Sequence, residues 1–301
     1  MASDLSPASR RRMQLALLLT PVSLFFAVFF LGPLAIMIAT SFLAPGLYGG
    51  VEWVFYPHNY GRILGFADPA FEDFDPVYIS IFLRSLKIAA FTVIATLLVC
   101  YPAAFCIARL SERSKNFCLF LITLPFFASL IVRLFIWVLI LRQTGIVNEM
   151  LLATGVIDRP LELIYTDGAI VLGMVYIFIP FMFMPVYASV EKLDWTLVRA
   201  SLDLGAGPIR TFLRIILPLT SPGIAGGAII VFIPALGNFV VPAVLGGAKV
   251  MMLGNLIEQQ FLSARNWPFG SALAMMVMSV MLVMLFVYVI ATGRRGADVT
   301  N

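Results

Sequence analysis

The sequence predicts an all-helical membrane protein, and its composition supplies the main evidence. Of its 301 residues, 61% are hydrophobic and 12% are charged, with a mean hydropathy of +1.00. An average soluble domain is about 45–50% apolar and about 25% charged, so this chain has too few charged residues to cover a soluble fold. The composition excludes soluble enzymes, disordered chains and fibrous proteins. It indicates a polytopic protein with one transmembrane domain over residues 1–301.

Six stretches are long enough to cross a bilayer, whose apolar core of about 30 Å needs roughly 20 helical residues. They are predicted at residues 15–40, 88–107, 117–141, 169–190, 222–245 and 271–292. Arg10, Arg11 and Arg12 precede the first stretch. Its apolar run is nevertheless longer than the roughly 7–15 residues of a signal peptide, so we interpret it as an uncleaved helix.

The positive charges predict the orientation of these helices. With the N-terminus inside, the inner segments contain the richer set of Lys and Arg, including Arg109, Lys192 and Arg210. Cytoplasmic loops carry this excess, so both termini are expected in the cytoplasm. The outer loop at 142–168 is predicted to contain a short helix between Gly145 and Gly155.

An inner loop at about 191–217 has a helix–turn–helix pattern. Asp194 can cap the start of a short helix, and Leu197, Ala200 and Leu204 recur at the spacing of one apolar helical face. Gly205 stands where a helix end favours a left-handed residue. The loop therefore predicts a short cytoplasmic helix that ends in a tight turn.

The second helix of this loop is expected to return the chain to the membrane. Pro208 suits the first position of a helix. Pro218 and Pro222 are expected to end that helix before the fifth span begins. A short rigid helix held at both ends can transmit a force. The alternative is an amphipathic helix lying on the membrane surface.

The loop resembles the cytoplasmic loop of ATP-binding-cassette (ABC) importer permeases. That family has a Glu-Ala-Ala pattern, then three residues, Gly, about nine residues and an apolar-x-Leu-Pro ending. The matching positions are Ala200, Gly205, Ala206, Phe212, Ile215, Leu217, Pro218, Pro222, Gly223 and Ile224. The resemblance implies a type I importer permease fold with a coupling helix at about 196–204 that docks into a cytoplasmic ATPase.

The resemblance also names the residues that would contact the ATPase. They are Arg199, Ala200, Ser201, Leu202, Asp203, Leu204, Gly205, Ala206 and Pro208. Two of them depart from the family pattern, because Arg199 stands where the family has Glu and Ser201 stands where it has the second Ala. Arg199 therefore either pairs with an acidic partner or is solvated.

Other segments extend the resemblance to the spermidine/putrescine branch, and there to the first permease subunit. They include 124–126, 181–185, 191–194, 245–249 and 266–270. This implies a bacterial inner-membrane protein for binding-protein-dependent polyamine import. It also implies a second permease subunit in a heterodimer, two ATP-binding subunits, a periplasmic binding protein and contact with membrane lipid, but no nucleic acid.

Several residues of the apolar helices are candidates for the substrate pathway. They are Arg133, Asn238, Tyr176, Tyr187, Phe127, Trp137 and the outer Glu258. A charged residue inside a span faces protein or a water-lined cavity, while aromatic rings can attract cations. The alternatives are a snorkelling or helix-pairing role for Arg133, an interhelical hydrogen bond for Asn238 and ordinary packing for the aromatic residues.

Asn238 lies between Pro234 and Pro242 in the fifth span, where two prolines and Gly237 are expected to loosen the backbone. A polyamine carries several positive charges, yet the spans contain no clear Asp or Glu. Its carboxylate partners would come from the second permease or from outer acids such as Glu258. The outer acidic run at Asp68, Glu72, Asp73 and Asp75 would attract cations, dock the binding protein or form a solvated loop.

Other function classes lack the residues they need. The segment 246–249 does not have the spacing of an ATP-binding phosphate loop, so no cofactor is expected here and ATP and Mg²⁺ are assigned to the partner ATPase. A single histidine and three unpaired cysteines give no metal site and no catalytic constellation. An importer of another solute and an ion-coupled secondary transporter remain as alternatives, although the spans show neither a carboxylate nor a repeat.

Overall fold

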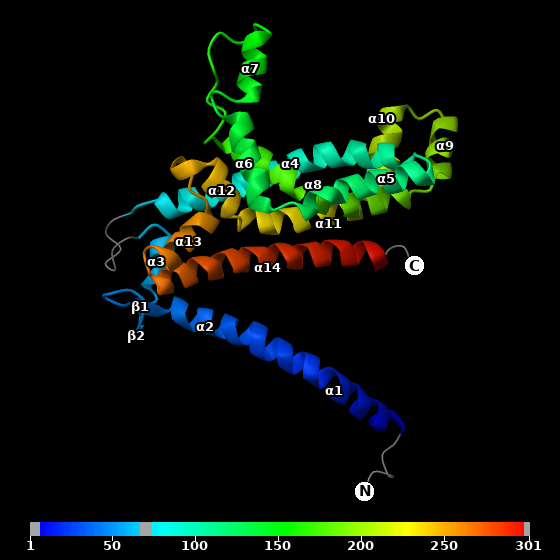
Figure 1. The fold of residues 1–301 in the computed structure, drawn as a ribbon. Coiled ribbons are helices and arrows are strands. Elements are labelled where there is room, and N and C mark those ends of the chain that lie inside the picture. Colours follow the sequence, from blue (N-terminus) through cyan, green and yellow to red (C-terminus); the bar gives the residue numbers. More distant parts are fainter. Residues whose placement is uncertain (1–6, 67–73, 298–301) are drawn as a thin grey trace. The chain divides into compact units, whose positions relative to one another are not determined.

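The computed structural model describes residues 7–66 and 74–297, and helices make up most of them (Figure 1). The helices among these residues that are long and apolar enough to cross a membrane number six: Leu17–Ser41, Val77–Ala108, Leu130–Ala153, Asp167–Glu191, Pro208–Leu236 and Trp267–Ile290. The predicted fold class is therefore confirmed. Of the acidic run in the first outer loop, Asp68, Glu72 and Asp73 lie outside the described residues.

The chain divides into two compact units. One consists of Met1–Asp75 with Gln259–Met276, and the other of Pro76–Glu258 with Val277–Asn301. The last helix, α14 (Trp267–Ala297), contributes residues to both. The expected single domain over residues 1–301 stays a prediction.

The smaller unit contains the first span and a short hairpin. Its elements are α1 (Pro7–Phe26), the π-helical η1 (Ala27–Leu31), α2 (Gly32–Ser41), β1 (Leu43–Pro45), β2 (Val51–Phe55), α3 (His58–Ile63) and the start of α14. The strands are antiparallel, with Leu43 opposite Phe55. The buried Asn59 amide donates to the carbonyls of Ser41 (3.0 Å) and Leu43 (2.9 Å). This side chain therefore joins the end of the first span to the hairpin.

The larger unit contains the remaining elements. They are α4 (Val77–Ala108), α5 (Glu112–Thr123), the 3₁₀-helical η2 (Leu124–Phe127), α6 (Leu130–Leu141), α7 (Ile146–Ala153), α8 (Asp167–Glu191), α9 (Trp195–Asp203), α10 (Pro208–Thr211), the π-helical η3 (Phe212–Ile216), α11 (Leu217–Leu236), α12 (Val240–Leu245), the 3₁₀-helical η4 (Gly247–Lys249) and α13 (Leu253–Leu262), which the other unit completes. The helices α4, α8 and α11 pack together and form its core (Figure 1).

Small residues let the core helices approach closely. Gly223 and Gly227 lie one turn apart on α11, and a side chain at either would overlap α8 at Pro185 or Met182. Glycines at this four-residue spacing are typical of close helix contacts in membranes. A larger residue at Gly227 would cost about 1–3 kcal/mol through overpacking.

The third span differs from the prediction of one helix over 117–141. The chain leaves the helix after η2, because Ala128 and Ser129 are extended, and α6 then begins at Leu130. Pro125 lies three residues before Ala128; it lacks a backbone N–H and so interrupts the helical hydrogen bonds there. The expected short helix of the outer loop is confirmed as α7, with Gly145 as its N-cap.

The fifth span begins earlier than predicted, and the expectation that Pro218 and Pro222 end a helix is wrong. The helix runs without interruption from Pro208 to Leu236. At the π-helical turn the Leu217 N–H bonds to the Phe212 carbonyl five residues back. One turn later the Ser221 hydroxyl donates to the Pro218 carbonyl (2.8 Å), which Pro222 cannot reach with an N–H. The Ser221 hydroxyl thus replaces the hydrogen bond that Pro222 cannot make, and the helix continues past both prolines.

The helix breaks instead at residues 237–239, where the sequence predicts a loosened backbone. The Asn238 Oδ1 accepts a hydrogen bond from the Val241 N–H (2.9 Å) at the start of α12. The Asn255 amide donates to the Phe239 carbonyl (2.9 Å). A side chain on Gly254 would overlap the carbonyl oxygens of Gly237 and Asn238. The break is thus covered by the start of α13.

Candidate functional site: the α9 loop and the polar residues of the spans

The helix α9 is capped at its start by Asp194. The Asp194 Oδ1 accepts hydrogen bonds from the backbone N–H of Thr196 (2.9 Å) and from its hydroxyl (2.7 Å). These two donors, the hydroxyl first, hold the pKa of the Asp194 carboxyl below its usual value. The cap that the sequence predicts at this position is therefore present as an ionised carboxylate.

The end of α9 is a complete Schellman motif. Gly205 has a φ of +80°, its N–H bonds to the Leu202 carbonyl (2.9 Å), and the Ala206 N–H bonds to the Ser201 carbonyl (3.1 Å). A side chain at Gly205 would meet no atom within 4 Å. Glycine is required here because of the left-handed backbone conformation. Space for a side chain is not the limit.

Side chains anchor both ends of α9 to the core. At its start, the Trp195 ring lies 6.1 Å from Phe105 of α4, edge to face, and the Arg109 guanidinium carbon lies 4.8 Å from the Trp195 ring centre. At its far end, the Ser201 Oγ is 3.0 Å from the Thr211 Oγ1 of α10. The helix is therefore held against two different helices of the core.

The predicted apolar face of α9 lines a groove of about 640 Å³ between α9 and the helix that begins at Pro208. Leu197, Ala200 and Leu204 contribute to it from α9, with Arg210 and Arg214 on the opposite wall. Leu204 is 89% exposed and Leu197 47% exposed. Exposed leucines beside arginines form a surface suited to binding another protein.

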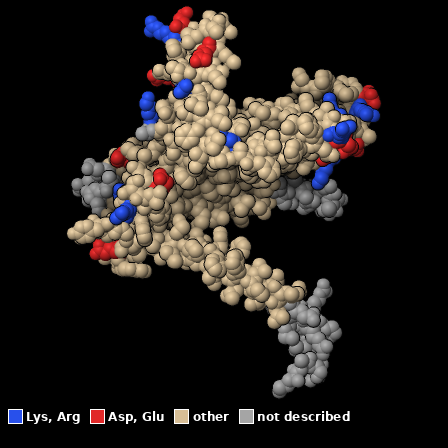
Figure 2. Space-filling view, viewed as in Figure 1, with Lys and Arg blue, Asp and Glu red and all other residues tan. Residues whose placement is uncertain are grey.

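The remaining predicted contact residues lie on the same loop. Leu202 and Asp203 are exposed, Ala206 lines the groove, and Pro208 is the first residue of α10. Arg199 is exposed and lines a second recess of about 350 Å³ together with Arg109 and Trp195. Figure 2 shows Lys and Arg together with Asp and Glu around this end of the larger unit.

Sequence reasoning missed the anchors of α9. Tyr101, Phe105 and Arg109 recur every four residues and so share one face of α4. That spacing could have drawn attention to them, but nothing in the sequence links this face to Trp195. Ser201 was identified as a departure from the family pattern, and its partner Thr211 was not.

Three of the proposed pathway residues meet between α6 and α8. The Trp137 and Tyr176 rings are 5.7 Å apart, edge to face, and the Arg133 guanidinium carbon lies 6.0 Å from the Tyr176 ring centre. The Arg133 Nε is buried, and no acceptor for it is found within the described part of the chain. A buried N–H of a charged group without an acceptor is costly in a span unless a further group or water meets it.

The other pathway candidates lie apart from this cluster. Phe127 is 83% exposed on η2. Tyr187 is buried near the end of α8, where its hydroxyl donates to Glu191 (2.8 Å), which also pairs with Lys115 at 3.1 Å. Asn238 lies at the break of the fifth span, and Glu258 is half-buried on α13. Their roles in a pathway stay predictions.

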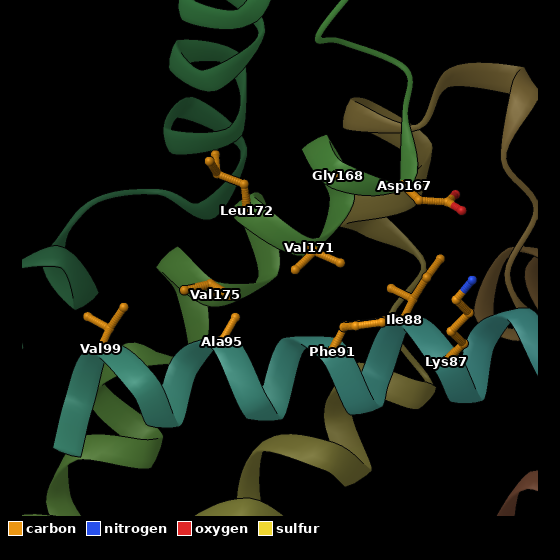
Figure 3. A pocket seen from close by; sticks show the side chains of 10 residues that line it. All are labelled: Lys87, Ile88, Phe91, Ala95, Val99, Asp167, Gly168, Val171, Leu172 and Val175. Carbon is orange, nitrogen blue, oxygen red and sulfur yellow. The ribbon is translucent and has the colours of Figure 1, made fainter.

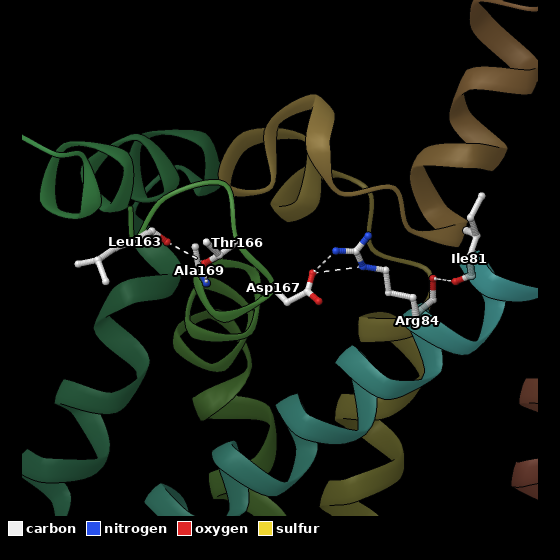
Figure 4. Close-up of polar contacts among 7 residues, drawn as sticks. Ile81, Arg84, Leu163, Thr166, Asp167 and Ala169 are labelled. Atoms are coloured by element: carbon white, nitrogen blue, oxygen red, sulfur yellow. Dashed lines mark hydrogen bonds and ion pairs between the residues drawn. The ribbon is translucent and has the colours of Figure 1, made fainter. Parts of the chain in front are cut away.

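A cavity of about 590 Å³ between α4 and α8 has a different chemistry. Its lining from Ile88 to Val99 is apolar, with Lys87 and Asp167 at one end (Figure 3). Asp167 is 2.7 Å from Arg84, and Thr166 caps α8 beside it by accepting from the Ala169 N–H (Figure 4). With its carboxylate already paired and Lys87 next to it, this cavity does not suit a cation.

Comparison with known proteins shows the family. Residues 100–295 match the family described as "Binding-protein-dependent transport system inner membrane component". The chain is 41% identical over 256 residues to the spermidine/putrescine transport system permease protein PotB of Salmonella typhimurium strain SL1344, covering 85% of this chain and 86% of that protein. It is 42% identical over 256 residues to PotB of Escherichia coli strain K12, covering 85% and 90%.

Two further comparisons have lower sequence identity. The chain is 34% identical over 236 residues to the inner membrane ABC transporter permease protein YdcU of Escherichia coli strain K12, covering 74% of each. A chain of a bacterial ABC transporter involved in alginate import superposes with a TM-score of 0.73 at 18% identity, covering 95% of this chain and 96% of that one. From the family match and the PotB identity it follows that the chain belongs to the binding-protein-dependent transport system inner membrane components.

Proposed function

We propose that the chain is the permease subunit of an ATP-driven polyamine importer and forms half of its translocation pathway. Support for the cargo comes from the relatives named for spermidine and putrescine, which match over 85% of the chain. In this proposal a second permease subunit completes the pathway. Two ATP-binding subunits supply the energy, and a periplasmic binding protein delivers the polyamine.

The loop around α9 carries the proposal for energy coupling. Its helix is capped by Asp194, closed by Gly205, and tied to α4 and α10 by Trp195 and Ser201. A helix held in this way moves with the core and cannot swing freely. Its groove remains open to a partner. We assign this loop to contact with the ATPase, with Arg199 replacing the usual acid of the family.

The charge distribution supports an orientation with α9 in the cytoplasm. Charged side chains of both signs gather at the α9 end of the larger unit (Figure 2). Over residues 109–115 and 191–214, Lys and Arg outnumber Asp and Glu, as expected for a cytoplasmic face. With six spans, we then expect both termini on that same side. The protein is accordingly assigned to the bacterial inner membrane, with α7 and the break at 237–239 toward the periplasm.

In the proposed cycle, ATP-driven closure of the ATPases displaces α9, and the displacement rearranges the spans so that the pathway opens outward. The cation enters from the binding protein, and hydrolysis restores the inward-facing state. The carboxylates of α8 lie at its two ends, and both are paired, Asp167 with Arg84 and Glu191 with Lys115. Carboxylates for the cargo are therefore expected from the partner permease.

Uptake by the reconstituted complex tests the proposal. The permease, its partner permease, the ATPase and the binding protein are placed in liposomes, and ATP-dependent uptake of labelled spermidine and putrescine is compared with uptake of a neutral amino acid. We expect polyamine uptake at least tenfold above the amino acid. Tight binding of a different solute by the cognate binding protein, without polyamine binding, would overturn the assigned cargo.

A substitution on α9 tests the coupling separately. Ala200→Asp places a charge and added bulk in the α9 groove and should leave basal ATP hydrolysis but reduce uptake per ATP at least fivefold. Ser114→Asp is the matched control, because it adds the same charge at an exposed position on α5. Equal uptake per ATP in both variants would contradict the assignment of α9.

A further inference from the structure

Four aromatic rings form a continuous chain of contacts from α9 into the core. The Trp195 ring on α9 lies 6.1 Å from Phe105 on α4, and Phe105 lies 5.1 Å from Tyr101 one turn away. Tyr101 then contacts Phe212, the first residue of the π-helical η3, at 5.8 Å. The planes of the first and last pairs are nearly perpendicular, at 87° and 88°. Edge-to-face contacts of this kind are favourable and directional.

The same tyrosine also reaches the far side of the π-helical turn. Its hydroxyl is 2.9 Å from the Thr220 Oγ1, which in turn donates to the Ile216 carbonyl at 2.8 Å. Tyr101 therefore contacts Phe212 at the start of η3 with its ring and, through Thr220, Ile216 at its end. A π-helical turn has one more residue per hydrogen bond than its neighbours and is a common place for a helix to change its local geometry.

These contacts connect α9, α4 and the start of the fifth span in a closed loop. Trp195 connects α9 to α4, Tyr101 connects α4 to both ends of η3, and the Ser201–Thr211 contact returns from α10 to α9. Aromatic rings have few rotatable bonds, and packed interiors respond to displacement as units. The contacts that start at α9 therefore reach the fifth span at two points, Thr211 and Phe212.

We propose that Trp195, Phe105, Tyr101 and Phe212 form an aromatic relay that positions α9 against α4 and passes its displacement to the π-helical turn of the fifth span. The inference rests on the proposed function of α9 as the ATPase-coupling helix. It adds positioning residues outside the docking loop, on α4 and at the start of the fifth span. It also gives the π-helical turn a function as the hinge that receives the motion.

The test uses the reconstituted complex and four substitutions at three positions of the relay. Phe105→Leu and Trp195→Leu remove ring contacts, whereas Trp195→Phe keeps an aromatic ring. Tyr101→Phe keeps the ring but removes the hydroxyl that reaches Thr220. The matched control is Phe91→Leu, since Phe91 lies on the same helix α4, is half-exposed and contacts none of the relay rings in the described structure.

We measure assembly of the complex, ATP hydrolysis stimulated by the loaded binding protein, and uptake per ATP. Each leucine variant should assemble and hydrolyse ATP but lose at least fivefold in uptake per ATP. The double variant with Phe105→Leu and Trp195→Leu should lose no more uptake per ATP than the more impaired single variant, because both substitutions interrupt the same series of contacts. Trp195→Phe should recover at least half of the wild-type value, and Phe91→Leu should resemble wild type.

Wild-type uptake per ATP in both leucine variants would overturn the relay, as would independent, multiplying losses in the double variant. If a leucine variant fails to assemble, Tyr101→Phe decides the matter, because it changes one hydroxyl: a loss of uptake per ATP supports the relay, and wild-type coupling refutes it. Ala200→Asp separates the two proposals. If that variant uncouples while the relay variants do not, only the relay is wrong; if none of them uncouples, α9 is not the coupling helix.

Discussion

The two short helices α7 and α9 end in the same way but are held by different parts of the molecule. Gly155 after α7 has a φ of +69°, and Gly205 after α9 has a φ of +80°. In α7 the N–H groups of Gly155 and Val156 bond to Leu152 and Leu151, the same Schellman pattern as in α9. Neither glycine has an atom within 4 Å of the place a side chain would take. Their local chemistry is therefore equivalent.

The attachments of the two helices differ. The buried Asn148 of α7 accepts from the Leu161 N–H (2.8 Å) and donates to the carbonyls of Leu161 (3.0 Å) and Arg142 (3.2 Å). All of these groups belong to the loop that contains α7. By contrast, α9 is tied through Trp195 and Ser201 to α4 and α10. The helix α7 thus contacts its own loop and α6, the helix that precedes it directly, whereas α9 is fastened to α4, which is distant in the sequence, as well as to α10.

The sharpest test of this difference places the same residue at both glycines. Gly205→Val and Gly155→Val each force a branched side chain into a left-handed conformation, at about 1–2 kcal/mol of local strain. We expect Gly205→Val to lower uptake per ATP at least tenfold and Gly155→Val to change it less than twofold. Gly205→Asn, which tolerates the left-handed region, should recover most of the activity.

Hydrogen exchange of the two helices serves as the control for this comparison, since both substitutions should raise exchange in the last turn of their own helix to a similar extent. Similar losses of uptake from both glycines would show that α7 and α9 are equally important to transport and would refute the distinction drawn from their attachments.

A smaller effect is expected from the amide that holds α7. Asn148→Leu leaves the Leu161 N–H without its acceptor in a part-buried site, which costs about 1–3 kcal/mol. The carbonyls of Arg142 and Leu161 keep the N–H groups of Gly145 and Leu163 as donors. The loop of residues 142–161 should then open locally, with faster hydrogen exchange and faster proteolysis. The exchange of α9 and the uptake per ATP should remain unchanged. A parallel loss of protection in α9 would mean that the two loops are coupled, contrary to their separate attachments.

These comparisons also indicate how far the sequence predicts the structure. The cap at Asp194, the turn at Gly205 and the helix start at Pro208 depend on neighbours within a few residues, so residue type and spacing are sufficient to predict them. The break near Asn238 follows likewise from two prolines and a glycine. Six spans follow from the length of the apolar runs, which the bilayer thickness sets.

The failures share a different cause. Pro218 and Pro222 are expected to end a helix, yet the helix continues past both, and the Ser221 hydroxyl supplies the hydrogen bond that Pro222 lacks. The anchors of α9 join residues far apart in the chain, such as Phe105 with Trp195, and local patterns carry no information on such pairs. The sequence predicts three pathway residues separately: Arg133, Trp137 and Tyr176. Only the fold shows that they contact one another between α6 and α8.

The smallest expected effect concerns pH, and it also separates the two helices. The native pKa of Asp194 is lowered, so its cap contributes stability above the unfolded value of 3.8 and loses that contribution as the pH falls through the lowered native value. Protection of the first turn of α9 should therefore decline in acid. The N-cap of α7 is Gly145, which has no titrating side chain and makes no such contribution.

Asp194→Asn provides the reference for this measurement, because asparagine caps helices about as well as aspartate and does not titrate. Hydrogen exchange of the wild type and of this variant, compared at each pH from neutral to about 3, cancels the intrinsic pH dependence of exchange. We expect the protection of α9 to be lower in the wild type than in Asp194→Asn at acid pH. The protection of α7 should be the same in both proteins at every pH. A constant ratio in α9 over this range would show that the Asp194 carboxylate does not control the start of the helix.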